Sequence, residues 1–333
     1  MPQGETRFDV VGVGNAIVDI LARVDERALL ESGLRKGAMA LVDEARSDAL
    51  RAMAKPEAVM SGGSAANTMA GLASFGARAA FIGKVKDDEP GRGFAGALRG
   101  AGVHYSTPFS GEGPGTAVCL VWVTPDGERT MNTYLGACRA LTPDDVDEGE
   151  VASAAITYLE GYLWDPPSAK DAFRKAVRIA HGAGRQVALS LSDAFCVDRY
   201  RDEFLGLMRD GSADIVFCNE GELRSLYQTA DFNTGLRALA AERVHGVVTR
   251  GAEGCVVARP GAAPESVPAR RVETVVDTTG AGDLFAAGYL AGLARGEPVR
   301  RCAELGALGA GEIIKHLGAR PQVDLRAMAD GTR

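Results

Sequence analysis

The sequence has few of the residues from which metal and redox sites are built. It contains four histidines, far apart, and six cysteines without a Cys-x-x-Cys pair. A zinc site and a disulfide framework are therefore not indicated. No apolar run reaches the roughly 20 residues of a membrane helix, and no basic segment with an apolar core and cleavage site opens the chain. We expect a reduced, cytoplasmic protein that does not contact a membrane.

Positive charge is also in short supply. Lys and Arg number 37 against 44 Asp and Glu, which gives a formal net charge of −7. No stripe of Lys and Arg is present, so a nucleic-acid-binding surface is not expected. The apolar share of 46% is ordinary for a globular protein and sufficient for a large core. Because the chain has no linker, low-complexity tract or fixed repeat, we expect residues 1–333 to form a single domain.

Strand and helix patterns alternate along most of the chain, which predicts a parallel sheet covered by helices on both faces. Strands are expected over residues 8–14, 79–83, 154–160, 186–191, 214–218 and 245–250, and helices over 44–54, 68–75, 90–100, 168–182, 199–209, 284–295 and 299–317. A hairpin over 116–124 and 129–135, with an Asp-Gly turn, interrupts the alternation. With strands near 20 and 40 it would form a small separate sheet.

Two polar side chains, Asn15 and Asp19, interrupt the apolar run that follows the first strand. The preceding Gly12-x-Gly14 does not indicate a dinucleotide site, because Ile17 stands where the third glycine would be. A carboxylate and an amide at the end of a strand suit the paired hydroxyls of a sugar. The alternative is a turn Asn and a solvent-facing Asp.

Residues 275–285 read as a strand end, a tight turn and the start of a helix, which we expect to be amphipathic over residues 284–295. The small residues 280–282 allow a ligand to approach the backbone closely. The free N–H groups of a first helical turn would face an anion there. Asp283 would then lie beside an anion hole, where it either caps the helix or accepts a proton.

Three further segments place polar residues at the start of a helix or the end of a strand. Gly62 and Gly63 precede a helix that carries Asn67 one turn in, where a simple capped helix is the alternative. Asn219 and Glu222 share the first turn of a helix, which capping alone can explain. The segment Thr249-x-Gly251 follows a strand, at the edge where open α/β sheets bind nucleotides.

Residues 277–283, Asp-Thr-Thr-Gly-Ala-Gly-Asp, resemble the C-terminal signature of the PfkB, or ribokinase, family of carbohydrate and nucleoside kinases. Residues 62–67 are similar to its N-terminal signature, and Asn219 with Glu222 to its Asn-x-x-Glu motif. The matching elements follow the family order over nearly the whole chain. The resemblance implies a three-layer α/β/α sandwich with a mostly parallel central sheet. It also implies a small β-sheet lid from about residues 16–25, 37–43 and 104–137.

The resemblance assigns roles to individual residues. Asp283 would be the general base, the amides of Gly280, Ala281 and Gly282 the anion hole, and Arg129 a contact to the transferring phosphoryl group. The acceptor would be held by Asn15, Asp19, Gly62, Gly63, Asn67 and Tyr134, and the nucleotide by Asn219, Thr249, Gly251 and Thr278. Glu222, with Asn219, would hold Mg²⁺ through water. Adenine would lie near residues 312–318.

ATP and Mg²⁺ are thus the expected cofactors, and the resemblance leaves open whether K⁺ activates and whether the chain is a monomer or a homodimer through the lid. Within the family the chain looks most like the adenosine kinase branch, on residues 14–19 and 132–136 and on Tyr162 and Trp164. These aromatic rings either stack a purine or pack in the core. The alternatives are a kinase of ribose, fructose or 2-keto-3-deoxygluconate and, more distantly, a non-catalytic nucleotide-binding protein.

Overall fold

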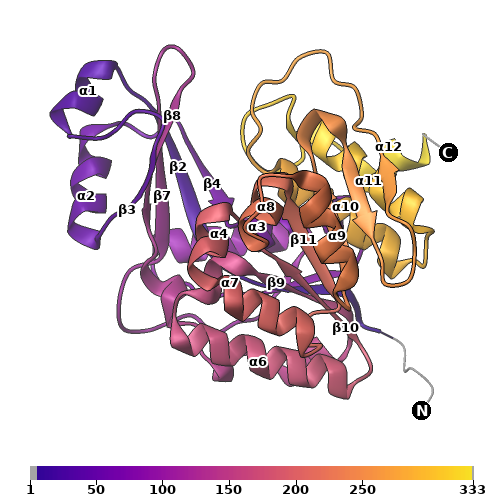
Figure 1. The fold of residues 1–333 in the computed structure, drawn as a ribbon. Coiled ribbons are helices and arrows are strands. Elements are labelled where there is room, and N and C mark those ends of the chain that lie inside the picture. The colour runs from indigo at the N-terminus through magenta and orange to yellow at the C-terminus, as the bar shows by residue number, and fades with distance from the viewer. Residues whose placement is uncertain (1–5, 332–333) are drawn as a thin grey trace.

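The described part of the chain, residues 6–331 of a computed structural model, is built around a nine-stranded sheet (Figure 1). Its strands, in order across the sheet, are β14 (Glu265–Val267), β13 (Cys255–Ala258), β12 (His245–Thr249), β11 (Ile215–Asn219), β10 (Gln186–Ser190), β9 (Ala154–Glu160), β1 (Phe8–Val13), β5 (Ala79–Ile82) and β6 (His104–Tyr105). Neighbouring strands from β12 to β6 pair parallel to one another, whereas β13 pairs antiparallel with both β12 and β14. The predicted, mostly parallel sheet is confirmed.

Strand β1 lies at the point where the direction of the winding reverses. It pairs with β5 on one side and β9 on the other, so that Gly12 lies opposite both Phe81 and Tyr158. The chain moves outward from β1 to β5 and β6, and later outward in the other direction from β9 to β12. Loops that leave the carboxyl ends of β1 and β9 therefore diverge, which opens a crevice where ligands of α/β proteins bind.

Helices cover both faces of the large sheet. They are α3 (Ser64–Ser74), α4 (Glu89–Gly100), α5 (Glu148–Ala152), α6 (Pro167–Gly182), α7 (Ala194–Arg209), α8 (Glu220–Leu226), α9 (Phe232–Ala241), α10 (Ala281–Ala294), α11 (Val299–Ile313) and α12 (Leu325–Asp330). One core contains apolar side chains of α3, α4, α10 and α11, and a second core those of α6 to α9. This arrangement is the expected three-layer sandwich. No helix within residues 6–331 is long and apolar enough to span a bilayer.

A second sheet of five strands stands off the large one, at the upper left of Figure 1. Its order is β3 (Met39–Leu41), β8 (Arg129–Tyr134), β7 (Ala117–Val123), β2 (Ile17–Arg23) and β4 (Ala58–Gly62). Leu29 of α1 (Glu26–Glu31), Leu50 of α2 (Glu44–Met53) and Trp122 of β7 are buried, and they belong to the same core as α3, α4, α10 and α11. The predicted hairpin is confirmed as β7 and β8, which pair antiparallel.

The small sheet differs from the expected ranges at two points. Strand β4 was not anticipated, and it pairs antiparallel with β2. Conversely, residues 104–137 were expected to belong to the lid, but this segment begins with β6, which pairs with β5 in the large sheet. A two-residue edge strand has too short a pattern to be assigned from sequence.

Two expectations about residues 275–295 were wrong. Val275 and Val276 are not in a strand, and they are 56% and 52% exposed. Helix α10 is not amphipathic, because residues 284–292 are all buried between the sheet and α11. A helix buried on every side is apolar on every side.

Candidate active site

Helix α10 begins at the turn that the sequence singled out. Its N-cap, Gly280, has a φ of 78°, and a Cβ there would lie 2.8 Å from the Cβ of Ala319. Only glycine fits such a left-handed position without strain. The N–H of Ala281 already donates to the carbonyl of Thr278 at 3.1 Å. The first-turn amides that follow have no carbonyl partner within the helix and can face an anion.

Asp283 does not cap this helix, because its carboxylate points across to α3. Oδ1 accepts a hydrogen bond from Ser64 Oγ at 2.6 Å, and Oδ2 accepts one from Asn67 Nδ2 at 3.0 Å. Burial raises the pKa of Asp283, while these two hydrogen bonds and the charge of Arg320 lower it. A carboxylate of raised pKa beside free amides can accept a proton from a hydroxyl while the amides bind an anion.

The turn between β4 and α3 brings Asp19 into the same region. A Cβ on Gly62 would lie 2.3 Å from Asp19 Oδ2, so the absence of a side chain is what lets this carboxylate approach. Gly63 has a φ of 91°, and a Cβ there would lie 2.1 Å from the carbonyl oxygen of Asn15. Burial raises the pKa of Asp19 to about 7 and Asp283 adds to this effect, whereas Arg320 and Arg129 oppose it.

Glu160, at the end of β9, is a site residue that the sequence did not indicate. Its carboxylate accepts hydrogen bonds from Asn15 Nδ2 at 2.7 Å and from the N–H of Ala65 at 2.8 Å. It thereby joins the loop after β1 to the first turn of α3, across the crevice between β1 and β9. Burial raises the pKa of Glu160 to about 7. No local motif marks this residue, since its importance comes from the pairing of β9 with β1.

Three cavities adjoin one another along this edge of the large sheet. We call them the α11 cavity, of about 580 Å³, the central cavity, of about 350 Å³, and the small-sheet cavity, of about 690 Å³. Asp283 lines the central cavity. The α11 and central cavities share Thr249, Thr278, Ala281, Gly282 and Phe285, and the central and small-sheet cavities share Ser64 and Tyr162. Molecules bound in the two outer cavities would therefore approach each other through the central cavity, which Asp283 lines.

The α11 cavity suits an apolar, flat group with a polar extension. Its walls include Val272, Val275 and Ile314, and its end toward the central cavity carries Thr249 and Gly251. The predicted nucleotide residues Thr249, Gly251 and Thr278 are thus brought together in one cavity, and Ile314, from the range 312–318 expected near adenine, lines it as well. An adenine ring matches the apolar walls, and the triphosphate matches the amide-lined end.

Asn219 and Glu222 line the central cavity opposite Asp283. They form a capping box, in which the Asn219 side chain accepts from the N–H of Glu222 at 2.9 Å and Glu222 Oε2 accepts from the N–H of Asn219 at 3.0 Å. Burial raises the pKa of Glu222 to about 7, and the charge of Asp193 adds to this effect. No described group of three His, Cys, Asp or Glu side chains is arranged to hold a metal ion. One buried carboxylate beside the central cavity fits Mg²⁺ held through water, since this ion keeps most of its water.

Arg129 reaches from β8 of the small sheet to the signature loop. Its guanidinium forms an ion pair with Asp277 Oδ2 at 2.9 Å and donates to Thr279 Oγ1 at 2.7 Å. Asp277 also accepts from the N–H groups of Thr279 at 3.1 Å and Gly318 at 3.0 Å. Asp277 therefore organises the loop, a role that its place at the head of the signature motif could have indicated.

The small-sheet cavity contains some of the predicted acceptor residues and omits others. Of these, Asn15 and Gly63 line it, whereas Asp19, Gly62 and Asn67 do not. The other lining residues include Ser64, Met39, Leu41, Met131, Thr133, Tyr162, Phe195 and Arg199. Tyr134 does not line it, because successive strand residues point to opposite faces and Met131 and Thr133 take the cavity face. On the other face, burial and the nearby Glu44 carboxylate raise the pKa of Tyr134.

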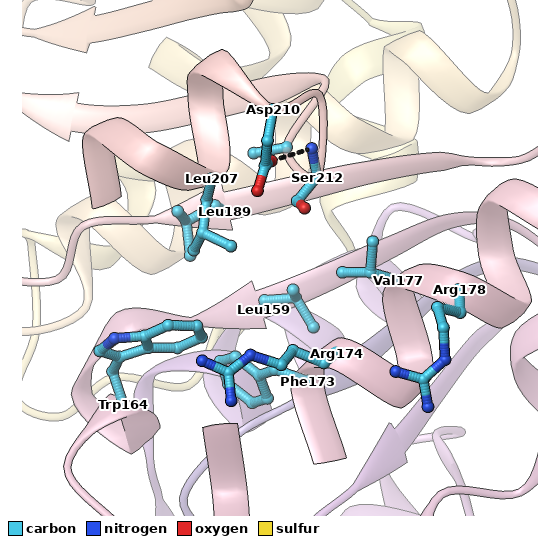
Figure 2. A pocket seen from close by; sticks show the side chains of 11 residues that line it. Leu159, Trp164, Phe173, Arg174, Val177, Arg178, Leu189, Leu207, Asp210 and Ser212 are labelled. Atoms are coloured by element: carbon cyan, nitrogen blue, oxygen red, sulfur yellow. Dashed lines mark hydrogen bonds between the residues drawn. The ribbon is translucent and has the colours of Figure 1, made fainter. Parts of the chain in front are cut away.

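The two aromatic residues after β9 have different surroundings. Tyr162 is 41% exposed and lines both the central and the small-sheet cavities. Trp164 is buried in the other core, where it packs against Phe173 and Phe204. Figure 2 shows Trp164 with Phe173 beside a separate cavity of about 260 Å³, which is not lined by any of the predicted site residues. Trp164 is therefore a core residue.

The fold and the site together define a kinase of small hydroxylated molecules. A model of the pfkB family carbohydrate kinases matches residues 48–325, so the chain belongs to the PfkB family.

Solved structures resemble the chain over nearly its whole length. The adenosine kinase of Sinorhizobium meliloti is 51% identical, over 98% of this chain and 100% of that one, with a TM-score of 0.91. A probable sugar kinase from Rhizobium etli CFN 42 is 49% identical, over 98% and 99% of the two chains, with a TM-score of 0.92. The adenosine kinase of Saccharomyces cerevisiae is 29% identical over 331 residues, 93% of this chain and 95% of the yeast protein. The expected resemblance to the adenosine kinase branch is confirmed.

Proposed function

We propose that the protein transfers the γ-phosphoryl group of ATP to a primary hydroxyl of an adenosine-like nucleoside. The observation that carries the proposal is the series of adjoining cavities with Asp283 in the central one. A nucleotide in the α11 cavity and a nucleoside in the small-sheet cavity would present the phosphoryl group and the hydroxyl to the same carboxylate. Phosphoryl transfer is catalysed mainly by positioning and electrostatics, which this layout supplies.

The acceptor is positioned by the turn that follows β4. Asn67 Oδ1 is buried without a hydrogen-bond partner among the described residues, and Asp19 offers a carboxylate beside Gly62. Both groups are acceptors suited to sugar hydroxyls. Asp283 takes the proton of the acceptor hydroxyl. The oxygen of that hydroxyl then attacks the γ-phosphorus of ATP in line with the leaving ADP. The first-turn amides of α10 stabilise the charge on the transferred group.

Mg²⁺ held near Asn219 and Glu222 would supply further positive charge to the phosphates. Arg129, which already contacts Thr279 at the edge of the central cavity, is placed to add its guanidinium to the transferring group. Because Arg129 lies on β8, the small sheet would carry it into the site as a lid. Closure of such a lid excludes water from the reaction.

A nucleoside is favoured over a free sugar by the apolar walls of the small-sheet cavity. Met39 and Leu41 are 49% and 54% exposed on one wall, and Phe195 is 62% exposed on the other. A hexose is covered with hydroxyls and would leave these apolar side chains without an apolar partner. A purine ring would cover them. The Arg199 guanidinium lies 4.6 Å from the centre of the Phe195 ring, which holds the ring at the cavity.

The proposal is tested by measuring ADP release with a panel of acceptors. Adenosine, other nucleosides, ribose, fructose and 2-keto-3-deoxygluconate are each supplied with MgATP, in KCl and in choline chloride. We expect acceptor-dependent release with the highest kcat/KM for adenosine, and the salt comparison decides whether K⁺ activates. If a free sugar gives the highest value, the substrate assignment is wrong. If no acceptor raises ADP release above the acceptor-free control, the kinase proposal fails.

Removing the Phe195 ring is expected to weaken nucleoside binding specifically. Stacking on an aromatic side chain contributes about 1–3 kcal/mol per base, so Phe195→Ala should raise the KM for adenosine by roughly tenfold or more. The KM for ATP should stay the same, because the α11 cavity does not include this residue. The matched control is Leu30→Ala, which removes a side chain that is 79% exposed on α1. An unchanged KM for adenosine in the Phe195 variant would remove this residue from the base site.

A further inference from the structure

Arg320 is a half-buried cation that no sequence motif indicated. It follows Gly318 in the loop after α11, and its guanidinium makes three hydrogen bonds to the end of β4 and the first turn of α3. Nε donates to the Ser61 carbonyl at 3.1 Å, Nη2 to Ser61 Oγ at 3.1 Å, and Nη1 to the Ala66 carbonyl at 2.7 Å. Ser61 and Ala66 lie on either side of the Gly62–Gly63 turn. The planar guanidinium therefore holds that turn from both ends.

All three partners of Arg320 are neutral oxygens, although a buried charge is normally paired with an opposite one. Burial lowers the pKa of Arg320 to about 10, and the charges of Asp19 and Asp283 act against this effect. The charge of the guanidinium therefore acts on two carboxylates, Asp19 and Asp283, while its hydrogen bonds are made to Ser61 and Ala66.

These two carboxylates share a poorly solvated region. Asp283 raises the pKa of Asp19 and also that of Glu160. Of the cations that face this group, Arg129 lowers the pKa of Asp19, whereas Arg320 lowers the pKa values of both Asp19 and Asp283. The other titratable side chains that face Asp283 are Tyr158 and Tyr162. Without Arg320, like charges this close would tend to retain a proton.

We propose that Arg320 is a positioning residue of the catalytic site: its hydrogen bonds fix the Gly62–Gly63 turn, and its guanidinium brings a positive charge to the Asp19 and Asp283 carboxylates. The inference rests on the proposed function, in which Asp19 must accept hydrogen bonds from the acceptor while Asp283 accepts its proton. Arg320 acts through these two groups and not on the substrate, since all three nitrogens of its guanidinium are already bonded to Ser61 and Ala66.

The test is the pH dependence of kcat/KM for adenosine in Arg320→Met. Because both Asp pKa values are raised, activity is present at high pH and is lost as the pH falls through them, near pH 7 for Asp19. An opposite charge at close range shifts a carboxyl pKa by roughly one to three units. We therefore expect the acid limb of Arg320→Met to move upward by about one pH unit. Arg326→Met, which removes an exposed arginine of α12, should leave the limb in place.

Arg320→Lys separates charge from geometry. Lysine keeps the positive charge but cannot make the three-nitrogen contact, so its acid limb should stay near that of the wild type. Its plateau should fall by about tenfold, since small displacements at a catalytic site have large effects on rate. A role confined to folding would lower the plateau of both variants and leave both limbs unmoved. That result would overturn the proposal.

A measurement without turnover distinguishes failure of this inference from failure of the proposed function. Carboxyl ¹³C shifts of Asp-labelled protein are titrated, with Asp19 and Asp283 assigned from their Asn variants. Arg320→Met should raise both titration midpoints. Raised midpoints in a protein that phosphorylates no acceptor would support the role of Arg320 and reject the kinase proposal. Unmoved midpoints would reject the role of Arg320 even in an active enzyme.

Discussion

Asp283→Asn is expected to lower kcat by roughly 10²–10⁴, the range for loss of general-base assistance. Asparagine has nearly the same shape and retains an oxygen for Ser64 or Asn67, the two partners of the carboxylate. The substitution also removes a buried charge whose pKa is raised, so folding should not suffer. The ATP affinity should remain near normal, since Asp283 does not line the α11 cavity.

The measurement combines steady-state ADP release with calorimetric titration of ATP and a thermal melt. Asp202→Asn is the matched control, because it removes an exposed carboxylate from the outer helix α7. If Asp283→Asn keeps its kcat within a few-fold of the wild type, another group accepts the proton. If it also loses ATP binding, Asp283 acts in holding the nucleotide and the assignment as base is wrong.

Gly63→Ala is expected to be the most destabilising small substitution in the site. The new Cβ would lie 2.1 Å from the carbonyl oxygen of Asn15 and would occupy a residue with φ of 91°. Backbone strain of about 1–3 kcal/mol adds to overpacking of similar size. We expect the free energy of unfolding to fall by about 3 kcal/mol or more, and the KM for the acceptor to rise because Asn15 and Asp19 are displaced.

Chemical denaturation of the Gly63→Ala variant should be compared with that of Gly184→Ala. Gly184 also has a positive φ, of 70°, but a Cβ there would meet nothing within 4 Å. It therefore reports the conformational strain alone, about 1–2 kcal/mol. Equal losses in the two variants would mean that the contact with Asn15 relaxes freely and does not set the position of the turn.

The parts of the site that the sequence could predict are those with a local pattern. A glycine followed by small residues and an apolar run marks the start of α10 whatever lies around it, and Gly280 is the N-cap of that helix. The same holds for the Asn219–Glu222 capping box. The proximity of Asn67 to Asp283 followed from the resemblance, because these residues are far apart in the chain and only tertiary packing joins them.

The residues that were missed depend on long-range packing. Glu160 gains its partners because β9 pairs with β1, and Arg320 gains its partners because the loop after α11 folds back onto β4. Neither belongs to a motif, because Glu160 is the last residue of a strand and Arg320 lies in a loop. Val275 was misjudged for the opposite reason: an apolar pair before a turn is typical of a strand end, whereas here it lines the α11 cavity. Burial by a ligand and burial by a sheet leave the same apolar signal in a sequence.

The chain has two tryptophans, and each lies in a different structural unit. Trp122 is buried on β7 of the small sheet, and Trp164 is in the core beneath α6 and α7. Each indole therefore provides a separate optical reporter, one for the sheet proposed as a lid and one for the body of the protein. If Trp164 is replaced by phenylalanine, the remaining fluorescence reports on the small sheet. If Trp122 is replaced instead, it reports on unfolding of the body of the protein, in both cases without an added dye.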